Sequence, residues 1–304
     1  MILTMANITY IEKGNELSFT KNDATYVLKH KYLKVGHIKT HYVETGVGET
    51  ILVLPGYPGP WSVYVEMICE LSKNFHIISL NIPGFPGSTE PLPKGSGIIE
   101  QVEFIHNFQQ AIGFNIDYIL GISYGGVISL HYVQKFPGTI KKVILQSPAY
   151  NVKIITKKLK TLIDILQFAL DHPRFENVIL PIFQFLFWTI GLEIIIRSNG
   201  LGDVDKNIKK LILKDFEQVD LHALAEIAID TVKPQQTALF KEIKKPIMVI
   251  TGELDPQINP NASRYLADEI LPNAKFVSIK NGNHWLPVLK TDLFCEKVRE
   301  FILE

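Results

Sequence analysis

The sequence has few cysteines and no excess of charge of either sign. Its 304 residues include two cysteines, Cys69 and Cys295, and neither lies in a CxxC or other metal-like spacing. We therefore expect buried free thiols and no metal. Lys plus Arg equals Asp plus Glu, at 31 each, so no net field draws in nucleic acid or an acidic membrane surface. The expected partner is a neutral or weakly charged small molecule.

The N-terminus lacks the features of a secretory signal. Residues 1–6 are apolar, but Glu12 and Lys13 follow without a long apolar core or a small-residue cleavage site. We expect no secretory signal and a cytoplasmic location.

Short apolar runs alternate with helical patterns along most of the chain. Residues 32–43 alternate in the manner of an antiparallel hairpin. Five nearly continuous apolar runs then suit strands that are buried on both faces, namely 51–54, 77–80, 118–120, 143–145 and 247–250. A last strand is expected at 276–279. Because strands and helices alternate, the sequence predicts a mostly parallel, doubly wound sheet.

The alternation stops near residue 150 and resumes after residue 235, and the stretch between reads as helical. We expect a catalytic core formed by residues 1–150 and 236–304, with an inserted cap at 151–235.

The strongest motif is Gly121-Ile122-Ser123-Tyr124-Gly125, which matches G-x-S-x-G. It stands directly after an expected strand and directly before an expected helix, as a nucleophile elbow requires. The turn is so sharp that a Cβ two positions before or after the serine would clash with backbone. The pattern predicts Ser123 as a nucleophile.

A serine hydroxyl needs a base to take its proton, and the base needs an acid to hold its tautomer. Asp255 follows the strand at 247–250, and His284 follows the last strand. Both are expected at the carboxyl ends of strands, where open parallel sheets place their ligands. Glu253 is close enough to compete with Asp255 for the role of acid. The loop after residue 145 contains no acidic residue.

Acyl transfer also needs two amide donors for the oxyanion. We expect one to be the N–H of Tyr124 and the other to lie in the loop after residue 54. That loop reads Pro55-Gly56-Tyr57-Pro58-Gly59-Pro60, and Tyr57 keeps the N–H that its prolines lack.

Residues 32–150 and 245–303 resemble the α/β-hydrolase family. The matching features are the hairpin end Tyr42-Val43-Glu44-Thr45-Gly46, the oxyanion loop Gly56-Tyr57-Pro58-Gly59, the turn Pro83-Gly84-Phe85-Pro86-Gly87-Ser88, the elbow, and the acid and base loops. The resemblance implies an eight-stranded sheet with an inserted helical cap and a serine esterase or lipase without cofactor or metal. Two departures are Pro55 before Gly56, where the family commonly has His, and Asn81 near Pro83-Gly84, where it commonly has Asp. Ser123 argues against epoxide hydrolases and dehalogenases, which use an aspartate nucleophile.

The expected cap contains an apolar stretch at 178–196 in which Glu193 is the only charged residue. Its length approaches that of a membrane span, but Pro181, Gly191 and Glu193 favour a lid helix, and contact of the cap with a membrane surface is a weaker alternative. The predicted substrate pocket is formed by aromatic side chains of the cap and of the base loop, namely Phe183, Phe187, Trp188 and Trp285.

The sequence therefore predicts a serine hydrolase that cleaves a carboxylic ester of a small to medium, largely apolar substrate. Thioester hydrolysis, C–C bond hydrolysis, peptidase action and acyl transfer would use the same residues. A ligand receptor on the same fold is the alternative from a different class, because fold and function are separable.

Overall fold

The computed structural model describes residues 8–21, 23–85, 87, 90–92, 95–138, 140–150, 157–186, 204–216, 220–231, 233, 235 and 237–304. Their strands form one sheet in the order β1-β2-β3-β4-β6-β5-β7-β8-β9-β10. The strands are β1 (Ile8–Lys13), β2 (Glu16–Lys21), β3 (Ala24–Val35), β4 (Ile38–Thr45), β5 (Thr50–Leu54), β6 (His76–Leu80), β7 (Tyr118–Ile122), β8 (Lys142–Gln146), β9 (Ile247–Gly252) and β10 (Ala274–Ile279). The neighbours β1-β2-β3-β4-β6 pair antiparallel, and the neighbours β6-β5-β7-β8-β9-β10 pair parallel.

The expectation of eight strands is wrong, because the sheet has ten. The eight expected strands are β3 to β10, and the hairpin of β1 and β2 extends the antiparallel edge. Leu17 and Phe19 of β2 are buried, at 0% and 1% exposure. Covering these two side chains is the physical reason for the additional hairpin.

Strands β5, β7 and β9 of the parallel half are buried on both faces, as their apolar runs predict. Neighbouring residues of a strand point to opposite faces. On β5, Ile51 and Val53 belong to one core cluster, while Leu52 and Leu54 belong to the other. Each face therefore needs its own layer of helices.

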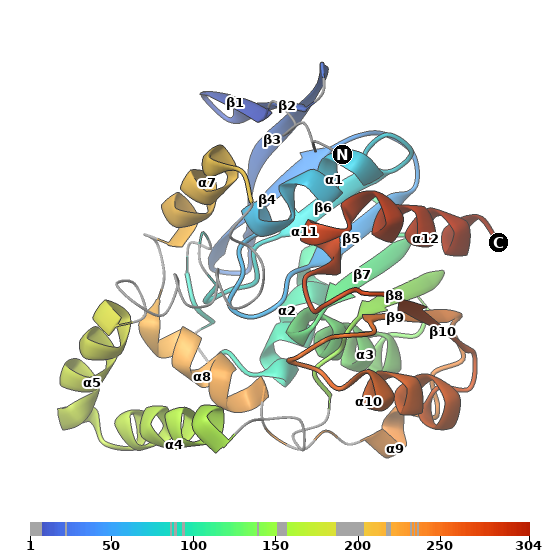
Figure 1. Ribbon diagram of the computed structural model, residues 1–304. Helices are drawn as coiled ribbons and strands as arrows, with labels where there is room; N and C mark the ends of the chain where they lie inside the picture. Colours follow the sequence, from blue (N-terminus) through green and yellow to red (C-terminus); the bar gives the residue numbers. More distant parts are fainter. Residues whose placement is uncertain are drawn as a thin grey trace.

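Figure 1 shows these two layers, with α1, α11 and α12 on one face of the sheet and α3 and α10 on the other. The helices outside the insertion are α1 (Val65–Leu71), α2 (Ile98–Ala111), α3 (Tyr124–Lys135), α9 (Thr237–Phe240), α10 (Pro260–Tyr265), α11 (Leu286–Leu289) and α12 (Thr291–Leu303), together with a 3-10 turn η1 (Trp61–Tyr64) and a π-helical turn η5 (Leu266–Ile270). Cys69 on α1 and Cys295 on α12 are buried free thiols, as expected.

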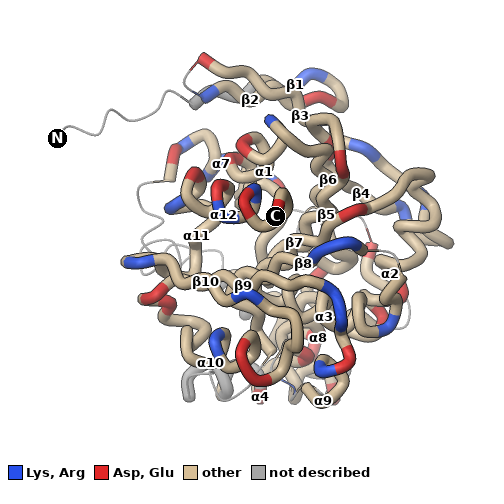
Figure 2. Tube along the Cα trace, turned by 90° about the vertical axis from the view of Figure 1, so that its right-hand side faces the viewer, with Lys and Arg blue, Asp and Glu red and all other residues tan. Residues whose placement is uncertain are grey.

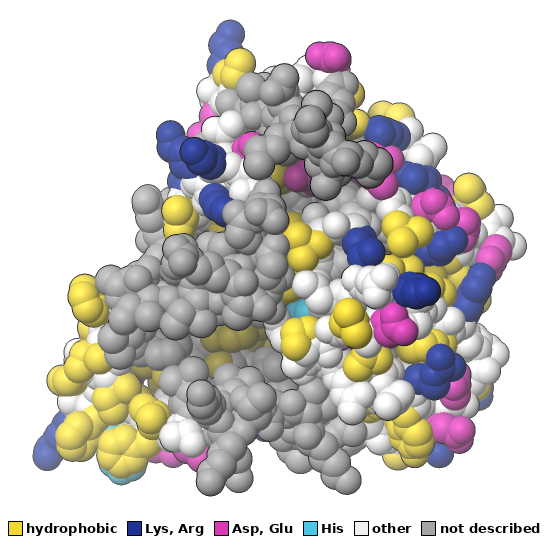
Figure 3. Space-filling model, viewed as in Figure 1, with side chains coloured by type: hydrophobic (Ala, Val, Ile, Leu, Met, Phe, Trp, Pro, Cys, Tyr) yellow, Lys and Arg dark blue, Asp and Glu magenta, His cyan; other side chains and the backbone are white. Residues whose placement is uncertain are grey.

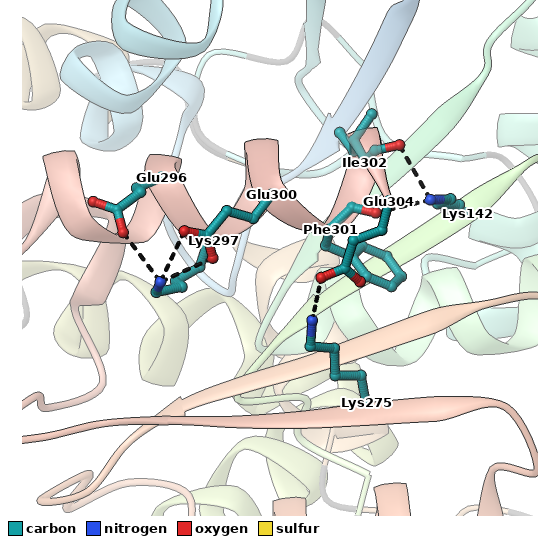
Figure 4. Close-up of polar contacts among 8 residues, drawn as sticks. All are labelled: Lys142, Lys275, Glu296, Lys297, Glu300, Phe301, Ile302 and Glu304. Carbon is teal, nitrogen blue, oxygen red and sulfur yellow. Dashed lines mark hydrogen bonds and ion pairs between the residues drawn. The ribbon is translucent and has the colours of Figure 1, made fainter.

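Lysine side chains fix the last helix to the sheet (Figure 4). Lys142 of β8 donates hydrogen bonds of 2.8 and 3.1 Å to the carbonyls of Phe301 and Ile302. These carbonyls lie in the last turn of α12, where intrahelical donors are missing. Lys275 of β10 forms an ion pair of 2.5 Å with Glu304.

Between β8 and β9 the described residues form helices and connecting turns, with no strand among them. The helices within the expected insertion are α4 (Lys157–Asp171), α5 (Pro173–Leu186), α7 (Lys206–Phe216) and α8 (Leu221–Thr231). Side chains of α4, α5 and α8 share a small apolar cluster that includes Leu166, Leu180 and Ile229. Figure 1 shows these three helices together at one end of the molecule, whereas α7 lies near β1.

Figure 2 shows that Lys and Arg positions alternate with Asp and Glu positions along the described chain. This distribution agrees with the zero formal net charge of the whole chain.

Candidate active site

Ser123 lies in the sharp turn between β7 and α3, with φ 51° and ψ −109°. A positive φ strains a residue that has a Cβ, and such strain persists only where the surroundings enforce it. The flanking glycines make the turn possible. A Cβ at Gly121 would lie 2.7 Å from the Cα of Gly126, and a Cβ at Gly125 would lie 2.7 Å from the carbonyl oxygen of Pro55. The turn therefore projects Ser123 beyond the carboxyl end of β7.

His284 and Asp255 meet although they follow different strands. Nδ1 of His284 lies 2.8 Å from Oδ2 of Asp255, and the two side chains are 6% and 0% exposed. An ionised carboxylate only accepts hydrogen bonds, so Nδ1 is the donor. This bond leaves Nε2 of the ring available to a hydroxyl.

Asp255 is held by further donors. Its Oδ1 accepts from the amides of Gln257 and Ile258, each at 2.9 Å. Its Oδ2 also accepts from the hydroxyl of Ser147 at 2.7 Å. Burial alone raises the pKa of Asp255, but the hydrogen bond and charge of His284, together with the bonds from Ile258 and Ser147, hold the pKa below its ordinary value. The carboxyl group is therefore ionised at neutral pH.

Glu253, the competing acid, points elsewhere. Its carboxylate accepts from the amide of Asn281 at 3.1 Å in an exposed position, and its own amide donates to the carbonyl of Ile279. The contact with the base is thus made by Asp255.

The acid and base loops are bound to each other through their backbones. The amide of Leu254 donates to the carbonyl of Gly282 at 2.8 Å. A Cβ at Gly252 would lie 2.5 Å from the carbonyl oxygen of Gly282, so the loops approach as closely as glycine allows. Asp255 and His284 consequently keep a fixed relative position.

Two polar residues at the end of β8 complete the site, namely Gln146, the last residue of the strand, and Ser147, which follows it. The sequence analysis did not single them out. Gln146 donates from Nε2 to the carbonyl of His284 at 3.0 Å and to the hydroxyl of Ser147 at 2.8 Å. The hydroxyl of Ser147 in turn donates its hydrogen bond to Asp255. The available signal was the position of Gln146 and Ser147 at the carboxyl end of a parallel strand, beside the acid and base strands.

Ser123, His284 and Tyr57 line one cavity of about 20 Å³ at the carboxyl edge of the sheet, together with Gly56, Tyr64, Ile122, Gln257, Trp285 and Pro287. Within the described ranges, the amides of Tyr57 and Tyr124 have no protein acceptor. Tyr124 is the first residue of α3, where the amides lack intrahelical partners. Of these two residues, Tyr57 lines the cavity, whereas Tyr124 is not among its lining residues.

Of the expected pocket residues, Trp285 lines this cavity. Phe187 and Trp188 lie outside the described residues, and so does the side chain of Phe183. Phe185, on α5, is 66% exposed. Figure 3 shows hydrophobic side chains gathered on the same part of the surface, over α4 and α5.

The described helices are shorter than a helix that spans a bilayer. None of them is both long enough and apolar enough to cross a membrane. α5 spans 14 residues, against the roughly 20 that a span requires.

Fold and site together define a class: an α/β protein with a serine elbow and a His–Asp pair at one edge of a parallel sheet. A family model described as alpha/beta hydrolase fold matches residues 49–291. That range is well over half of the chain, and the chain belongs to the α/β-hydrolase family. The family resemblance inferred from sequence is confirmed.

Curated relatives include lipases. The chain is 23% identical over 260 residues to monoacylglycerol lipase abhd6-B of Xenopus laevis, covering 79% of this chain and 72% of the relative. It is 23% identical over 293 residues to Lipase 1 of Psychrobacter immobilis, covering 94% and 87% respectively.

Solved structures share the fold. An esterase from Thermogutta terrifontis has a TM-score of 0.66 at 17% identity, covering 90% of this chain and 98% of that one. An epoxide hydrolase from Bacillus megaterium has a TM-score of 0.73 at 17% identity, covering 90% and 100%. At these identities the likeness concerns the fold alone.

Proposed function

We propose that this chain hydrolyses a carboxylic ester through an acyl-enzyme intermediate on Ser123. The observation that carries the proposal is that Ser123 lines the same cavity as His284, whose ring is hydrogen-bonded to Asp255. The names of the lipase relatives support an acyl ester as the substrate.

In the first half of the reaction, Ser123 Oγ attacks the ester carbonyl while His284 Nε2 takes its proton. The imidazolium that forms is stabilised by the ionised carboxylate of Asp255. The carbonyl oxygen becomes anionic and is bound by the amides of Tyr57 and Tyr124. His284 then gives its proton to the departing alcohol, and the acyl group stays on Ser123.

In the second half, water replaces the alcohol. His284 Nε2 removes a proton from the water, the resulting hydroxide attacks the acyl carbonyl, and the same two amides bind the oxyanion. The proton returns from His284 to Ser123, and the carboxylic acid leaves. Each step needs the Nδ1–H donor to Asp255, because this bond keeps Nε2 available for proton transfer.

We assign residues 151–235 to a cap that covers this edge of the sheet. Its separate apolar cluster from α4, α5 and α8 supports a unit with its own packing. Trp285 and Pro287 give the cavity apolar walls on the core side. An apolar acyl chain would gain roughly 0.8 kcal/mol for each buried methylene.

A fluorophosphonate probe tests the proposal, because it reacts with a serine that has an intact base and oxyanion hole. The wild-type chain should be labelled and should hydrolyse esters from a panel that also contains thioesters. The Ser123→Ala variant should not be labelled, and its turnover should fall by roughly 10³ to 10⁶. A folded wild-type protein that neither labels nor turns over any panel member would favour the receptor alternative.

A further inference from the structure

The oxyanion loop leads directly into the turn η1, whose four residues are all buried. Tyr57 lies in the loop, and η1 begins at Trp61. The hydroxyl of Tyr64 lies 3.4 Å from the amide of Gly56. A shift of η1 therefore moves the residues that present the amide of Tyr57.

One anchor of η1 comes from the core. The amide of Trp61 donates to Oδ1 of Asn81 at 3.3 Å, and Nδ2 of Asn81 donates to Nδ1 of His41 at 2.8 Å. His41 Nε2 lies 2.9 Å from His30 Nδ1. Burial, and then the neighbouring His30, lower the pKa of His41 to about 3. The imidazole of His41 therefore stays neutral at neutral pH. Asn81, which stands where the family commonly has an aspartate, is therefore the residue that connects His41 to η1.

The second anchor comes from the insertion. The hydroxyl of Ser62 donates to Oδ2 of Asp215 at 2.5 Å, and Asp215 lies in α7, 153 residues further along the chain. Two neighbouring residues of η1 are thereby bound to different parts of the protein, Trp61 to the core and Ser62 to the insertion.

The space between the two anchors is filled by backbone. A Cβ at Gly87, where φ is +75°, would lie 2.9 Å from Nδ2 of Asn81 and 3.3 Å from Oδ1 of Asp215. A side chain there would press on both anchors. The close approach of Gly87 indicates that Asp215 is held in a defined place.

We propose that Asp215 and Ser62 are positioning residues whose contact couples α7 to the oxyanion loop. This inference rests on the proposed function of the site. Neither side chain touches the cavity of Ser123; both act through η1 on the amide of Tyr57. Placement of α7 then sets the geometry of the oxyanion hole.

The surroundings of Asp215 give the contact a dependence on pH. Burial raises the pKa of Asp215 to about 7, against the opposing effects of the Ser62 hydrogen bond and of Lys214 on its own helix. Glu12 of β1, which pairs with Lys214 at 2.5 Å, adds to the raised pKa. Near the same pair, burial lowers the pKa of His30. The hydrogen bond from Ser62 becomes charge-assisted, and stronger, when Asp215 ionises.

The test compares Ser62→Ala, Asp215→Ala, their double variant and Asp215→Asn, with Glu12→Gln as matched control. Glu12→Gln removes the ion pair of β1 with Lys214 on α7 but keeps the contact of Ser62 with Asp215 that holds α7 to η1. With p-nitrophenyl butyrate at pH 8.5, each Ala variant should lower kcat about tenfold and change KM less than twofold. The double variant should lose no more than either single one, and Glu12→Gln should keep its kcat. The ratio of the wild-type kcat to the kcat of Asp215→Asn should rise as the pH increases through about 7, because Asp215 ionises over this range and Asn does not.

Hydrogen exchange gives a readout that needs no turnover. Ser62→Ala should speed amide exchange both in residues 55–64 and in α7. Glu12→Gln keeps the contact of Ser62 with Asp215 and should leave exchange in residues 55–64 unchanged. Exchange that rises only beside the substituted residue, additive losses of kcat in the double variant, or an equal loss in Glu12→Gln would each overturn the coupling. Wild-type protein without labelling or turnover would instead sink the proposed function, and the exchange result would still decide the coupling.

Discussion

Ser147 donates a hydrogen bond of 2.7 Å to Oδ2 of Asp255, the same oxygen that accepts from the imidazole of His284. The carboxylate of Asp255 is thus shared between His284 and a serine that directly follows the neighbouring strand β8. Such a donor stabilises the ionised carboxylate and fixes its orientation.

Removing this donor by Ser147→Ala should lower kcat/KM by roughly tenfold, since a hydrogen bond to a charged group contributes about 1.5 kcal/mol or more.

The pKa of Asp255 is depressed in the folded protein, against about 3.9 when unfolded. Its stabilising contribution is therefore present above about pH 4 and is lost as pH falls through the folded pKa. Urea unfolding should show Ser147→Ala to be more destabilising at pH 7 than at pH 3, and an equal loss at both would contradict the assignment.

Asp255→Asn should reduce kcat by roughly 10³ to 10⁴, because an amide can hold the imidazole in the wrong tautomer. Glu253→Gln is the matched control, since its carboxylate binds the amide of Asn281 on the surface. Steady-state kinetics of both variants decide between the two acids. A larger loss in Glu253→Gln would mean that the acid is misassigned.

Gly125→Ala should damage catalysis by displacing the backbone of the oxyanion loop. The added Cβ would meet the backbone of Leu54 and Pro55, where the oxyanion loop begins, and the loop must move to admit it. We expect kcat to fall by at least tenfold, as for a misplaced oxyanion donor. Gly138→Ala, which adds its Cβ in open space, should leave kcat unchanged in the same assay.

Chain-length selectivity should depend on Trp285 and not on Phe185. If the ring of Trp285 lines the acyl site, each added methylene improves kcat/KM of the wild type by up to about fourfold, and Trp285→Ala flattens that dependence. Phe185 is 66% exposed, so Phe185→Ala should keep the wild-type profile. The measurement is kcat/KM over a series of acyl esters, and identical profiles for all three proteins would remove Trp285 from the site.

The parallel strands and the elbow could be predicted because both leave local signals. Continuous apolar runs identify strands with two buried faces, and G-x-S-x-G requires glycine for steric reasons that the backbone around Ser123 repeats. The contact of Asp255 with His284 followed from the position of each residue at the end of a strand.

The hairpin of β1 and β2 and the contact of Ser62 with Asp215 were not predicted. Leu17 and Phe19 do alternate with polar residues after a Gly14-Asn15 turn, which is a hairpin signal, but two apolar residues in a charged segment form a weak pattern. Ser62 and Asp215 lie in separate parts of the chain, and no local sequence pattern predicts that they are in contact. Contacts between distant polar side chains depend on the packing of whole helices.

The strand β10 ends the sheet on the side opposite to the hairpin, and within the described residues it pairs with β9 alone. An unpaired strand can template intermolecular sheet growth. Here Lys275 stands within the strand, and its ammonium is held by Glu304 at the end of α12. A second molecule adding a strand at this position would have to desolvate that ion pair. The end of α12 thus supplies the partner of a charge on this edge strand, in addition to covering the core.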